Sequence, residues 1–492
     1  MEIVVSRKVM EKSESYTLAY LKSSKELMNL AGLAVMSCFY FNDSKVLVIC
    51  GSGNNAGDGY ALAYHLKKKG IDVSVALVSN KFSHFGKIYF DMCRKIKVPI
   101  LKVENADFSK YDILVDAIYG IGFKGRIPQK EAEIIKMINN SQKKVISIDI
   151  NSGLDADSGL ADICVKSFLT VSIGSYKLGH FLNSAPDNIG NLVNCNIGIP
   201  IIGEKISLMD SNDYKDILKE RPLYGSISDY GHIGIMGGSL DYSGAVKLSN
   251  MSLSSLRSGC GASRLIVPKE IALGVTPYLL ESTLMAFPSK DGKMVYDSKA
   301  INKALEGISV LLIGSGWGVS REHQLILKYI LENYSIPLII DDDGIKTLIR
   351  MNLDILKKTK CKVILTLNSF EFSKLSNCDI NELLNNPLEL VRIFADKYNV
   401  IVVLKGVSTI VTNGFKTHIV SKPFSVSKAG SGDVLAGIIA GVCGYNKISV
   451  KAVSCAVYIN NLASFLANKN QISFISSDTI NYIDKAICQM NK

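Results

Sequence analysis

The sequence predicts an α/β protein in which mainly parallel sheets carry helices on both faces. Short apolar segments recur along the 492 residues and alternate with stretches of helical periodicity. In the segment VLVICGSGNNAGDGYALAYHL (46–66), an apolar strand runs through a glycine-rich turn directly into a helical pattern. Repeated alternation of this kind is typical of βα units.

The expected strands fall into two groups. In the first part of the chain they cover 45–50, 71–78, 112–118, 144–150 and 168–173. In the second part they cover 232–236, 263–267, 309–314, 337–341, 362–366 and 400–404. The first 40 residues are predicted to be helical, ending at SKELMNLAGLAVMSCF. No repeat of a solenoid period is present, so we expect two different α/β domains.

The domain boundary is predicted where the alternation of strands and helices stops. Residues 203–225 are charged, lack the alternation and contain Pro222, which breaks regular structure. A chain of this length is expected to form more than one hydrophobic core. We therefore predict a first domain at 1–205, a linker at 206–224 and a second domain at 225–492.

The composition excludes several classes of protein. Hydrophobic residues make up 47% of the chain and charged residues 21%, as in soluble globular proteins. The N-terminal stretch has no apolar leader and the longest apolar runs are too short to cross a bilayer, so we expect a cytoplasmic protein without a membrane partner. The eleven cysteines are scattered singly, which argues against a zinc site or a disulfide framework.

The net charge of +11 raises the possibility of a polyanionic partner. Lys and Arg are mixed with Asp and Glu along the whole chain and do not form runs with interleaved aromatic residues. We therefore expect no nucleic acid partner. An anionic small molecule remains compatible with this charge.

Three strand ends in the first half carry polar groups. GSGNNAGDG (51–59) follows the first strand, Asp116 ends a second and Asp149 ends a third. Ligands of open α/β sheets bind outside the carboxyl ends of the strands. Glycine-rich turns present main-chain N–H groups to phosphate, whereas Asn and Asp supply oxygen ligands for a hard cation. Each group alone is also typical of a helix cap or a turn.

These motifs are similar to those of a known family. GSGNNAGDG, DAIYGIGFKGR (116–126), DINSGLDADSG (149–159) and TVSIGSYKLGH (170–180) resemble, in this order, the NAD(P)H-hydrate epimerase family of the YjeF N-terminal type. The resemblance covers residues 1–205 and implies a Rossmann-like three-layer fold. It also implies binding of hydrated NAD(P)H, interconversion of its R and S epimers, and a potassium ion in the site.

The resemblance assigns residues to roles. Asp149 is expected beside the nicotinamide ring and is the first candidate for the acid–base group, with Lys177 as the second. The expected potassium ligands are Asn55, Asp116 and Ser152. The residues expected to hold the hydrated dinucleotide are Asn54, Asn55, Ala56, Gly57, Asp58, Gly120, Ile121, Gly122, Phe123, Lys124, Gly125 and Arg126. The chain departs from the family pattern at Asn29, usually Glu, and at Asn151, usually Pro.

The strongest pattern of the second half is KAGSGDVLAGIIAG (428–441), in which glycines and Ser431 precede Asp433 at the start of a helical run. Such a loop directs N–H groups at a transferring phosphoryl group, and the aspartate can accept the proton of an attacking hydroxyl. A capped, glycine-rich helix start is the structural alternative.

The second half also resembles a known family. The motifs are YGHIGIMGGSLDYSGAVKLS (230–249), IGSGWG (313–318), IIDDDGIK (339–346), ILTLNSFEFSKL (364–375) and VVLKGVSTIVT (402–412). With the loop at 428–441 they are similar to the ADP- or ATP-dependent NAD(P)H-hydrate dehydratase family over residues 225–490. This resemblance implies a ribokinase-like α/β fold, in which the substrate hydroxyl is phosphorylated and phosphate then leaves, with Mg²⁺ on the nucleotide.

This second resemblance also assigns residues. Asp433 is the expected base. The residues expected to hold ADP are Lys405, Gly406, Val407, Ser408, Thr409, Pro423, Phe424, Ser425, Val426, Ser427, Lys428, Ala429, Gly430, Ser431 and Gly432. Those expected to face the hydrated dinucleotide are Gly316, Asn368, Ser369, Phe370, Glu371, Phe372, Ser373 and Lys374.

Three positions depart from the dehydratase pattern. Asn368 stands where the family usually has a histidine, and Asn does not titrate near neutral pH. Trp317, the only tryptophan of the chain, occupies an apolar position as a stacking surface or as bulk. Residues 341–345 read DDDGI in place of DADAL.

Together the two halves predict a bifunctional metabolite-repair enzyme. The first domain would epimerise NADHX and NADPHX, and the second would dehydrate the S epimer with ADP, giving AMP and phosphate. A ribokinase-like small-molecule kinase fused to a dinucleotide-binding module is one alternative, and a decayed binding protein is another. We also expect a homo-oligomer.

Overall fold

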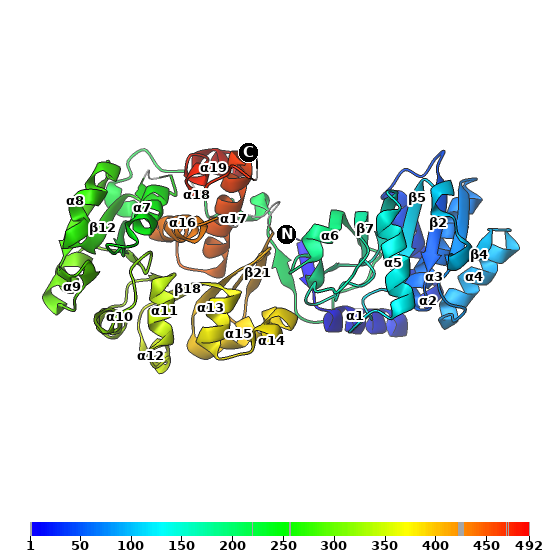
Figure 1. Cartoon of the computed structure of the whole chain (residues 1–492), viewed down its shortest axis with the longest axis horizontal. Helices are drawn as coiled ribbons and strands as arrows, with labels where there is room; N and C mark the ends of the chain where they lie inside the picture. The colour runs from blue at the N-terminus through cyan, green and yellow to red at the C-terminus, as the bar shows by residue number, and fades with distance from the viewer. Residues whose placement is uncertain are drawn as a thin grey trace. The chain divides into compact units, whose positions relative to one another are not determined.

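The computed structural model describes residues 2–218, 220–254, 257–421, 428–468, 470 and 472–491. The chain divides into two compact units (Figure 1). Residues 3–206 form the first, and residues 207–492 with the first two residues form the second. The predicted linker, 206–224, is thus grouped with the second unit from residue 207 onward, and Tyr214 within it is fully buried.

The first domain is built on a parallel sheet with the strand order β4-β3-β2-β5-β6-β7-β9. Its strands are β2 (Lys45–Cys50), β3 (Asp72–Leu77), β4 (Ile100–Lys102), β5 (Ile113–Ala117), β6 (Lys144–Ile148), β7 (Ser167–Ile173) and β9 (Ile189–Cys195). The chain passes from β2 outward to β3 and β4, then returns to β5 on the other side of β2. Such a reversal of strand order opens a crevice at the carboxyl ends of β2 and β5.

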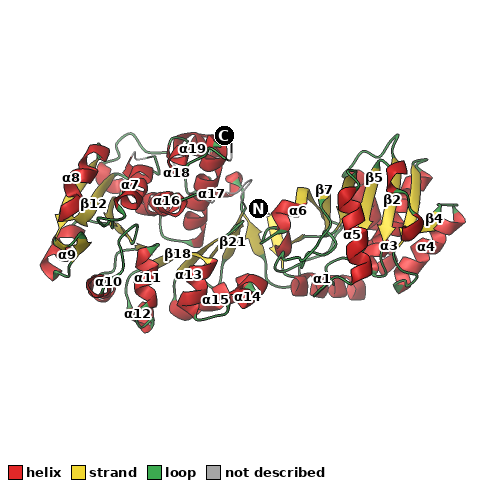
Figure 2. Ribbon diagram, in the orientation of Figure 1, coloured by secondary structure: helices red, strands yellow, loops and turns green. Residues whose placement is uncertain are grey.

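Helices cover both faces of this sheet (Figure 2). They are α1 (Arg7–Tyr20), α2 (Ser24–Ser37), α3 (Asn54–Lys68), α4 (His84–Lys95), α5 (Gln129–Asn140) and α6 (Ala185–Asn188). Val46 and Val48 of β2 pack in one core with α2, α3 and α4. Leu47 and Ile49 pack in another with α5. Alternate residues of the strand therefore bury opposite faces, which explains its continuous apolar sequence. The short strands β1 (Glu2–Val5) and β8 (Tyr176–Lys177) pair in parallel.

The second domain has a larger sheet, with the order β13-β12-β11-β16-β17-β18-β19-β20-β21-β10. Its strands are β10 (Ile206–Leu208), β11 (His232–Met236), β12 (Ala262–Pro268), β13 (Ser282–Phe287), β16 (Val310–Ile313), β17 (Leu338–Ile340), β18 (Val363–Asn368), β19 (Ile401–Lys405), β20 (Thr409–Thr412) and β21 (Thr417–Val420). The strands from β13 to β19 are parallel, and β20 is antiparallel to β19 and β21. A hairpin of β14 (Ser289–Lys290) and β15 (Lys293–Met294) lies apart.

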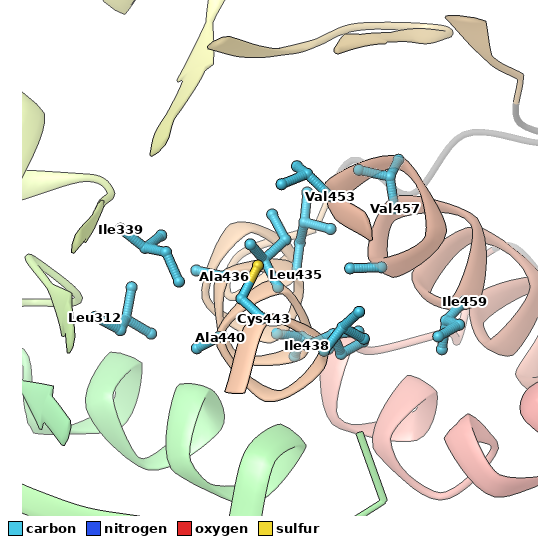
Figure 3. Packing of buried hydrophobic residues seen from close by; sticks show 14 of the residues in the cluster. Leu312, Ile339, Leu435, Ala436, Ile438, Ala440, Cys443, Val453, Val457 and Ile459 are labelled. Carbon is cyan, nitrogen blue, oxygen red and sulfur yellow. The ribbon is translucent and has the colours of Figure 1, made fainter. Parts of the chain in front are cut away.

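Two apolar helices, α16 (Ser431–Tyr445) and α17 (Val450–Ala467), form the core of this domain against the sheet. Figure 3 shows Leu435 and Ala436 of α16 together with Leu312 and Ile339 of the sheet and Val453 of α17. By length and composition α17 could cross a membrane, but 67% of its apolar window is buried inside the domain. A helix that is apolar all round is expected in such a core.

Smaller helices surround this core. They are α7 (Ser243–Ser254), α8 (Lys269–Val275), α9 (Ser298–Leu305), α10 (Arg321–Asn333), α11 (Asp343–Ile349), α12 (Asp354–Lys358), α13 (Ser369–Ser376), α14 (Ile380–Asn385), α15 (Pro387–Tyr398), α18 (Ser476–Ile480) and α19 (Ile483–Met490). All eleven predicted strands are confirmed within two residues at each end, and two helices follow β1 in the first 40 residues. The sequence did not predict β1, β4, β8, β9, β10, β13, β14, β15, β20 or β21.

Candidate functional site

Asp116, at the end of β5, is the centre of a buried hydrogen-bond network in the first domain. Its carboxylate accepts from the Ser152 hydroxyl (2.5 Å), the Ser152 N–H (2.9 Å) and the Ser147 hydroxyl (2.9 Å). The N–H of Ile118 adds a fourth bond at 3.2 Å. Burial raises the pKa of Asp116, and these hydrogen bonds oppose that shift.

Asn55 approaches the same network from the first turn of α3. Its amide donates to the carbonyl oxygen of Tyr119 over 2.8 Å, and Ser152 contacts that carbonyl at 3.3 Å. The Asn55 side-chain oxygen is buried and has no hydrogen-bond partner among the described residues. The structure therefore brings together the three predicted cation ligands, Asn55, Asp116 and Ser152, around the carbonyl group of Tyr119.

Asp149 and Lys177 form an ion pair that lies beside this network. Asp149 has a left-handed backbone, with φ of 67°, and its carboxylate accepts the N–H of Ile173 over 2.9 Å. The Lys177 ammonium is fully buried and donates to Asp149 and, over 2.8 Å, to the carbonyl of Ile173. Lys177 is thus a buried partner of Asp149.

His180 holds this pair in place. Its Nδ1 accepts the N–H of Lys177 at 3.2 Å, which leaves Nε2 as the donor to the carbonyl oxygen of Asp149 at 3.0 Å. Burial and the charge of Lys177 lower the pKa of His180 to about 3. The imidazole is therefore neutral at physiological pH and fixes the backbone on both sides of the ion pair.

A cavity of about 110 Å³ opens next to Ile173. Its polar lining consists of Asn54, Asp58, Ser24 and Glu14, and the rest is apolar. Asn54 and Asp58 belong to the predicted dinucleotide turn, whereas Glu14 of α1 was not predicted from the sequence. Burial, followed by the charge of Asp149, raises the pKa of Glu14 to about 7.

The other residues predicted for the first site differ in exposure. Ala56 and Gly57 are buried at the start of α3, so only their backbone could reach a ligand. Gly122, Lys124, Gly125 and Arg126 are exposed, and Ile121 and Phe123 are half-buried. The exposed Arg126 lies 3.6 Å from the carboxylate of Asp162. The loop from Gly120 to Arg126 is therefore accessible at the edge of the site.

In the second domain, Asp433 lies in the first turn of α16, after Gly430 with φ of 82°. A side chain at Gly430 would collide with Leu248 in addition to straining the backbone, so the tight turn requires glycine. Burial raises the pKa of Asp433 to about 7, and the charges of Asp341 and Asp342 contribute to the shift. A carboxyl group with such a pKa is suited to general-base chemistry near neutral pH.

Lys405 and Asp341 complete this centre from the ends of β19 and β17, the strands on either side of β18. Lys405 donates to Asp341 over 3.0 Å, and the Thr366 hydroxyl donates to the same carboxylate oxygen over 2.5 Å. A Cβ atom at Gly432 would lie 3.4 Å from the Lys405 ammonium and 3.9 Å from Asp341. The structure thus brings the predicted nucleotide-binding residue Lys405 to the glycine loop that precedes Asp433.

Asn368 caps α13 instead of presenting a free side chain. Its side-chain oxygen accepts the N–H of Glu371 over 2.9 Å, and the Glu371 carboxylate accepts the N–H of Asn368 over 2.9 Å. This reciprocal capping box accounts for an asparagine at this position. Burial raises the pKa of Glu371, and Lys405 is the main charge that opposes the shift.

The side chains of Phe372 and Trp317 are turned into the core. Phe372 is fully buried and packs against Phe394, with ring centroids 5.3 Å apart, whereas Phe370 on the same helix is exposed. Trp317 is fully buried, stacks on His323 at 4.3 Å and donates to the sulfur of Met294. Of the two interpretations of Trp317, its burial favours bulk, and Phe372 could meet a ligand only through its backbone.

The remaining predicted residues of this site also differ in exposure. Gly406, Val407, Lys428 and Ala429 are exposed, Ser431 and Gly432 are half-buried, and Gly316 is buried. Ser408 and Thr409 are buried, and the Thr409 hydroxyl has no hydrogen-bond partner in the described chain. Pro423, Phe424, Ser425, Val426 and Ser427 lie outside the described residues.

The fold and the two sites define a class of protein: an enzyme with a Rossmann-like dinucleotide domain and a separate kinase-like domain in one chain. Residues 24–179 match the family described as YjeF-related protein N-terminus, and residues 233–487 match NAD(P)H-hydrate dehydratase. The chain belongs to the family of bifunctional NAD(P)H-hydrate repair enzymes.

Relatives of this kind match along most of their length. The bifunctional NAD(P)H-hydrate repair enzyme Nnr of Dictyoglomus turgidum is 28% identical, covering 97% of this chain and 93% of that protein. The enzyme of the same name from Thermofilum pendens is 30% identical, covering 89% and 87% respectively.

A solved structure supports the fold of the second domain. The ADP/ATP-dependent NAD(P)H-hydrate dehydratase of Bacillus subtilis, crystallised with ATP and Mg²⁺, is 21% identical with a TM-score of 0.50. It covers 58% of this chain and 99% of its own. At this level of identity the likeness shows the fold alone, which is ribokinase-like as predicted.

Proposed function

We propose that the chain repairs hydrated nicotinamide dinucleotides with both of its domains. The first domain epimerises R- and S-NAD(P)HX, and the second dehydrates S-NAD(P)HX to NAD(P)H at the expense of ADP or ATP. The observation that carries the proposal is the presence of two separate sites in one chain of this family. One contains the ion pair of Asp149 with the buried Lys177, and the other contains Asp433 together with the ion pair of Asp341 and the half-buried Lys405.

In the epimerase site, Asn54 to Asp58 and Gly120 to Arg126 bind the dinucleotide, and Asp149 lies at the nicotinamide ring. The N-terminus of α3 at Asn54 is suited to a phosphate group because its first N–H groups point outward. The Lys177 ammonium donates to the Asp149 carboxylate and holds it in position, and that carboxylate can accept a proton from the substrate hydroxyl.

We propose that potassium binds between Asn55, Asp116 and Ser152. The unpartnered, buried side-chain oxygen of Asn55 and the nearby Tyr119 carbonyl fit a cation that prefers oxygen ligands. Asp116 is the only charged group of this set, which suits a monovalent ion. The ion would supply a positive charge next to the bound phosphates, while the protein groups hold that charge in position.

In the dehydratase site, Lys405 to Thr409 and the loop that ends at Gly432 bind the nucleotide. Lys405 lies beside Gly432, so its ammonium can contact a phosphate held by the loop. Asp433 then accepts the proton of the substrate hydroxyl as that oxygen attacks the terminal phosphoryl group. Phosphate leaves more readily than hydroxide, so loss of phosphate restores the dihydropyridine ring.

Magnesium is proposed to enter this site on the nucleotide, where it would neutralise the phosphate oxygens. Among the described residues, no group of three or more His, Cys, Asp or Glu side chains could hold a metal ion by itself. Coordination of magnesium mainly by nucleotide phosphates and water is common in kinases. Asp341 lies beside Gly432 of the glycine loop, and Asp433 directly follows that glycine on α16.

The proposal is tested by the recovery of NADH from a mixture of R- and S-NADHX with ADP and Mg²⁺, measured by the absorbance of the reduced nicotinamide. Recovery of all the NADH in two phases supports both activities. Recovery that stops at the S fraction contradicts the epimerase activity, and absence of recovery contradicts the dehydratase activity. A stable phosphorylated product without NADH would favour a small-molecule kinase instead.

A further inference from the structure

The helix α1 brings an unassigned carboxyl group, Glu14, to the epimerase site. Residues 24–179 match the YjeF-related family, so α1 (Arg7–Tyr20) precedes the matched part of the chain. The cavity next to Ile173 is lined by Glu14 together with Asn54 and Asp58 of the dinucleotide turn. Ile173 is itself bonded to both members of the Asp149–Lys177 pair. Glu14 therefore lines the same cavity as Ile173, the residue to which both members of the ion pair are hydrogen-bonded.

Several contacts fix α1 at this cavity. The N–H of Arg7 donates to the carboxylate of Asp157, and the Ser13 hydroxyl accepts the N–H of Ile202 over 2.9 Å. Val5 and Met10 are fully buried against Ile199, which also lines the cavity. The position of Glu14 is thus set by packing on both sides of the helix.

Glu14 has no structural partner that would explain it. Among the residues that the structure describes, none forms a hydrogen bond or ion pair with its carboxyl group. Glu11, one turn earlier, is instead exposed and lies 3.3 Å from the guanidinium of Arg7. A half-buried carboxyl group without a partner costs free energy, so a functional reason for it is expected.

We propose that Glu14 is a catalytic residue of the epimerase, which acts as the proton donor while Asp149 acts as the proton acceptor. The inference rests on the proposed function of the first domain. It gives the two carboxyl groups different roles, because the Lys177 ammonium donates a hydrogen bond to Asp149, whereas Glu14 has no cationic partner among the described residues.

The chemistry of the substrate requires such a pair. Water adds to the enamine double bond of a dihydronicotinamide at the carbon next to nitrogen, so one carbon carries both the hydroxyl and the ring nitrogen. Loss of the hydroxyl would generate a ring cation, and the dihydropyridine forms from the same cation. An epimerase that made this cation could therefore restore the dihydropyridine by itself, and the nucleotide of the second domain would be unnecessary. Epimerisation by opening the ring avoids that cation.

The step balances without any further reactant. Asp149 takes the hydroxyl proton as the C–O bond becomes C=O, and the electron pair of the C–N bond moves to the ring nitrogen. The nitrogen receives a proton from Glu14, which gives an open-chain aldehyde. After rotation about the adjacent C–C bond, nitrogen attacks the other face of the carbonyl. The nitrogen returns its proton to Glu14, and Asp149 returns the hydroxyl proton to the substrate oxygen.

The pKa of Glu14 is consistent with this role. Burial and the charge of Asp149 raise it to about 7, whereas Lys177 opposes the shift. Glu11 on the same helix adds a smaller charge effect, and Asp58 shares the cavity. A substantial fraction of Glu14 is therefore protonated at neutral pH, as a general acid requires.

The full-length chain tests the inference in the two-phase NADH recovery assay. The fast phase reports dehydration of the S epimer, and the second phase reports epimerisation. Glu14→Gln should leave the fast phase unchanged and slow the second phase by about 100-fold or more. The matched control Glu11→Gln should change neither phase. A second phase of wild-type rate in Glu14→Gln would overturn the inference.

The pH profile separates catalysis from a structural role. In the wild type, the second phase should slow as the pH rises through about 7, where Glu14 loses its proton. Glu14→Asp should recover part of the rate and show the same decline with pH. The rate of Glu14→Gln should not decline in this way. A decline that persists in Glu14→Gln would overturn the assignment. A wild type without any second phase would contradict the proposed epimerase itself.

Isotope labelling tests the ring-opening step. In water enriched in oxygen-18, the epimerised substrate should retain its original hydroxyl oxygen, apart from the exchange seen without enzyme. Incorporation of one labelled oxygen per epimerisation would overturn ring opening.

Discussion

Lys405 and Asp341 form an ion pair at the carboxyl ends of β19 and β17, with 3.0 Å between the ammonium nitrogen and the carboxylate oxygen. The strand between them, β18, supplies Thr366 to the same oxygen. The two charges act on Asp433 in opposite directions, because Asp341 raises its pKa and Lys405 lowers it. The pair therefore helps to set the proton affinity of the proposed base.

Asp433→Asn should abolish nucleotide-dependent recovery of NADH from S-NADHX. An amide cannot accept the hydroxyl proton, and loss of a general base costs about 10²–10⁴-fold in rate. The rate of conversion of the R to the S epimer, measured by chromatography of the substrate in the absence of ADP, should be unchanged. Wild-type recovery in this variant would refute the role of Asp433.

The dehydratase rate should rise with pH through about 7, because Asp433 must be deprotonated to act as a base and its pKa is raised to about 7. Asp342→Asn removes a negative charge that contributes to this raised pKa, so the midpoint of the pH–rate profile should move to lower pH. Asp354→Asn, which removes an exposed carboxylate paired with Lys357, is the matched control and should leave the midpoint in place. An upward shift in Asp342→Asn would contradict this electrostatic account.

Asn55→Ala should remove the response of epimerisation to potassium. The variant lacks the buried side-chain oxygen that has no partner in the described structure. The second phase of NADH recovery, measured in potassium and in tetramethylammonium chloride at equal ionic strength, should differ in the wild type and not in the variant. Asn42→Ala, an exposed substitution outside the site, should keep the wild-type response. If wild-type epimerisation is the same in both salts, the potassium site is contradicted.

Asn151→Ala should destabilise the first domain. The fully buried Asn151 donates to the Val165 and Asn188 carbonyls and to Ser167, and it accepts the hydroxyl of Thr170. Truncation leaves several of these groups unsatisfied, at a cost of at least about 2 kcal/mol in the free energy of unfolding.

Denaturant titration of Asn151→Ala, followed by circular dichroism, measures this change. Asn151→Pro, which restores the residue usual in the family, should be destabilising for the same reason. Asn191→Ala, at an exposed position on β9, is the control and should lie within about 0.5 kcal/mol of the wild type. A stability of Asn151→Ala equal to that of the control would contradict the proposed role of the network.

The strand pattern and the strand-end motifs could be predicted from the sequence because both are local. Apolar runs bounded by turns predicted eleven strands. Asp116 lies at the end of one of them, and Asp149 directly follows another. The contribution of Tyr119 could not be predicted, because it is a backbone carbonyl and any residue provides one. Glu14 was missed because a polar helical segment gives no sign of which distant strand end its side chain approaches.

Side-chain direction could not be predicted from the motifs either. Phe370 and Phe372 stand two residues apart on α13, and two residues on a helix point in widely different directions. A motif identifies the segment that approaches a ligand, but the helical period decides which members face it. The burial of Phe372 and the exposure of Phe370 therefore become clear only in the structure.

The position of Trp317 has a practical consequence. It is the only tryptophan of the chain, it is fully buried in the second domain, and it lies between two glycines of the loop that follows β16. Fluorescence excited selectively in tryptophan must therefore come from the dehydratase domain alone. The protein thus carries a built-in spectroscopic label, which allows unfolding of one domain to be followed while the other contributes no signal.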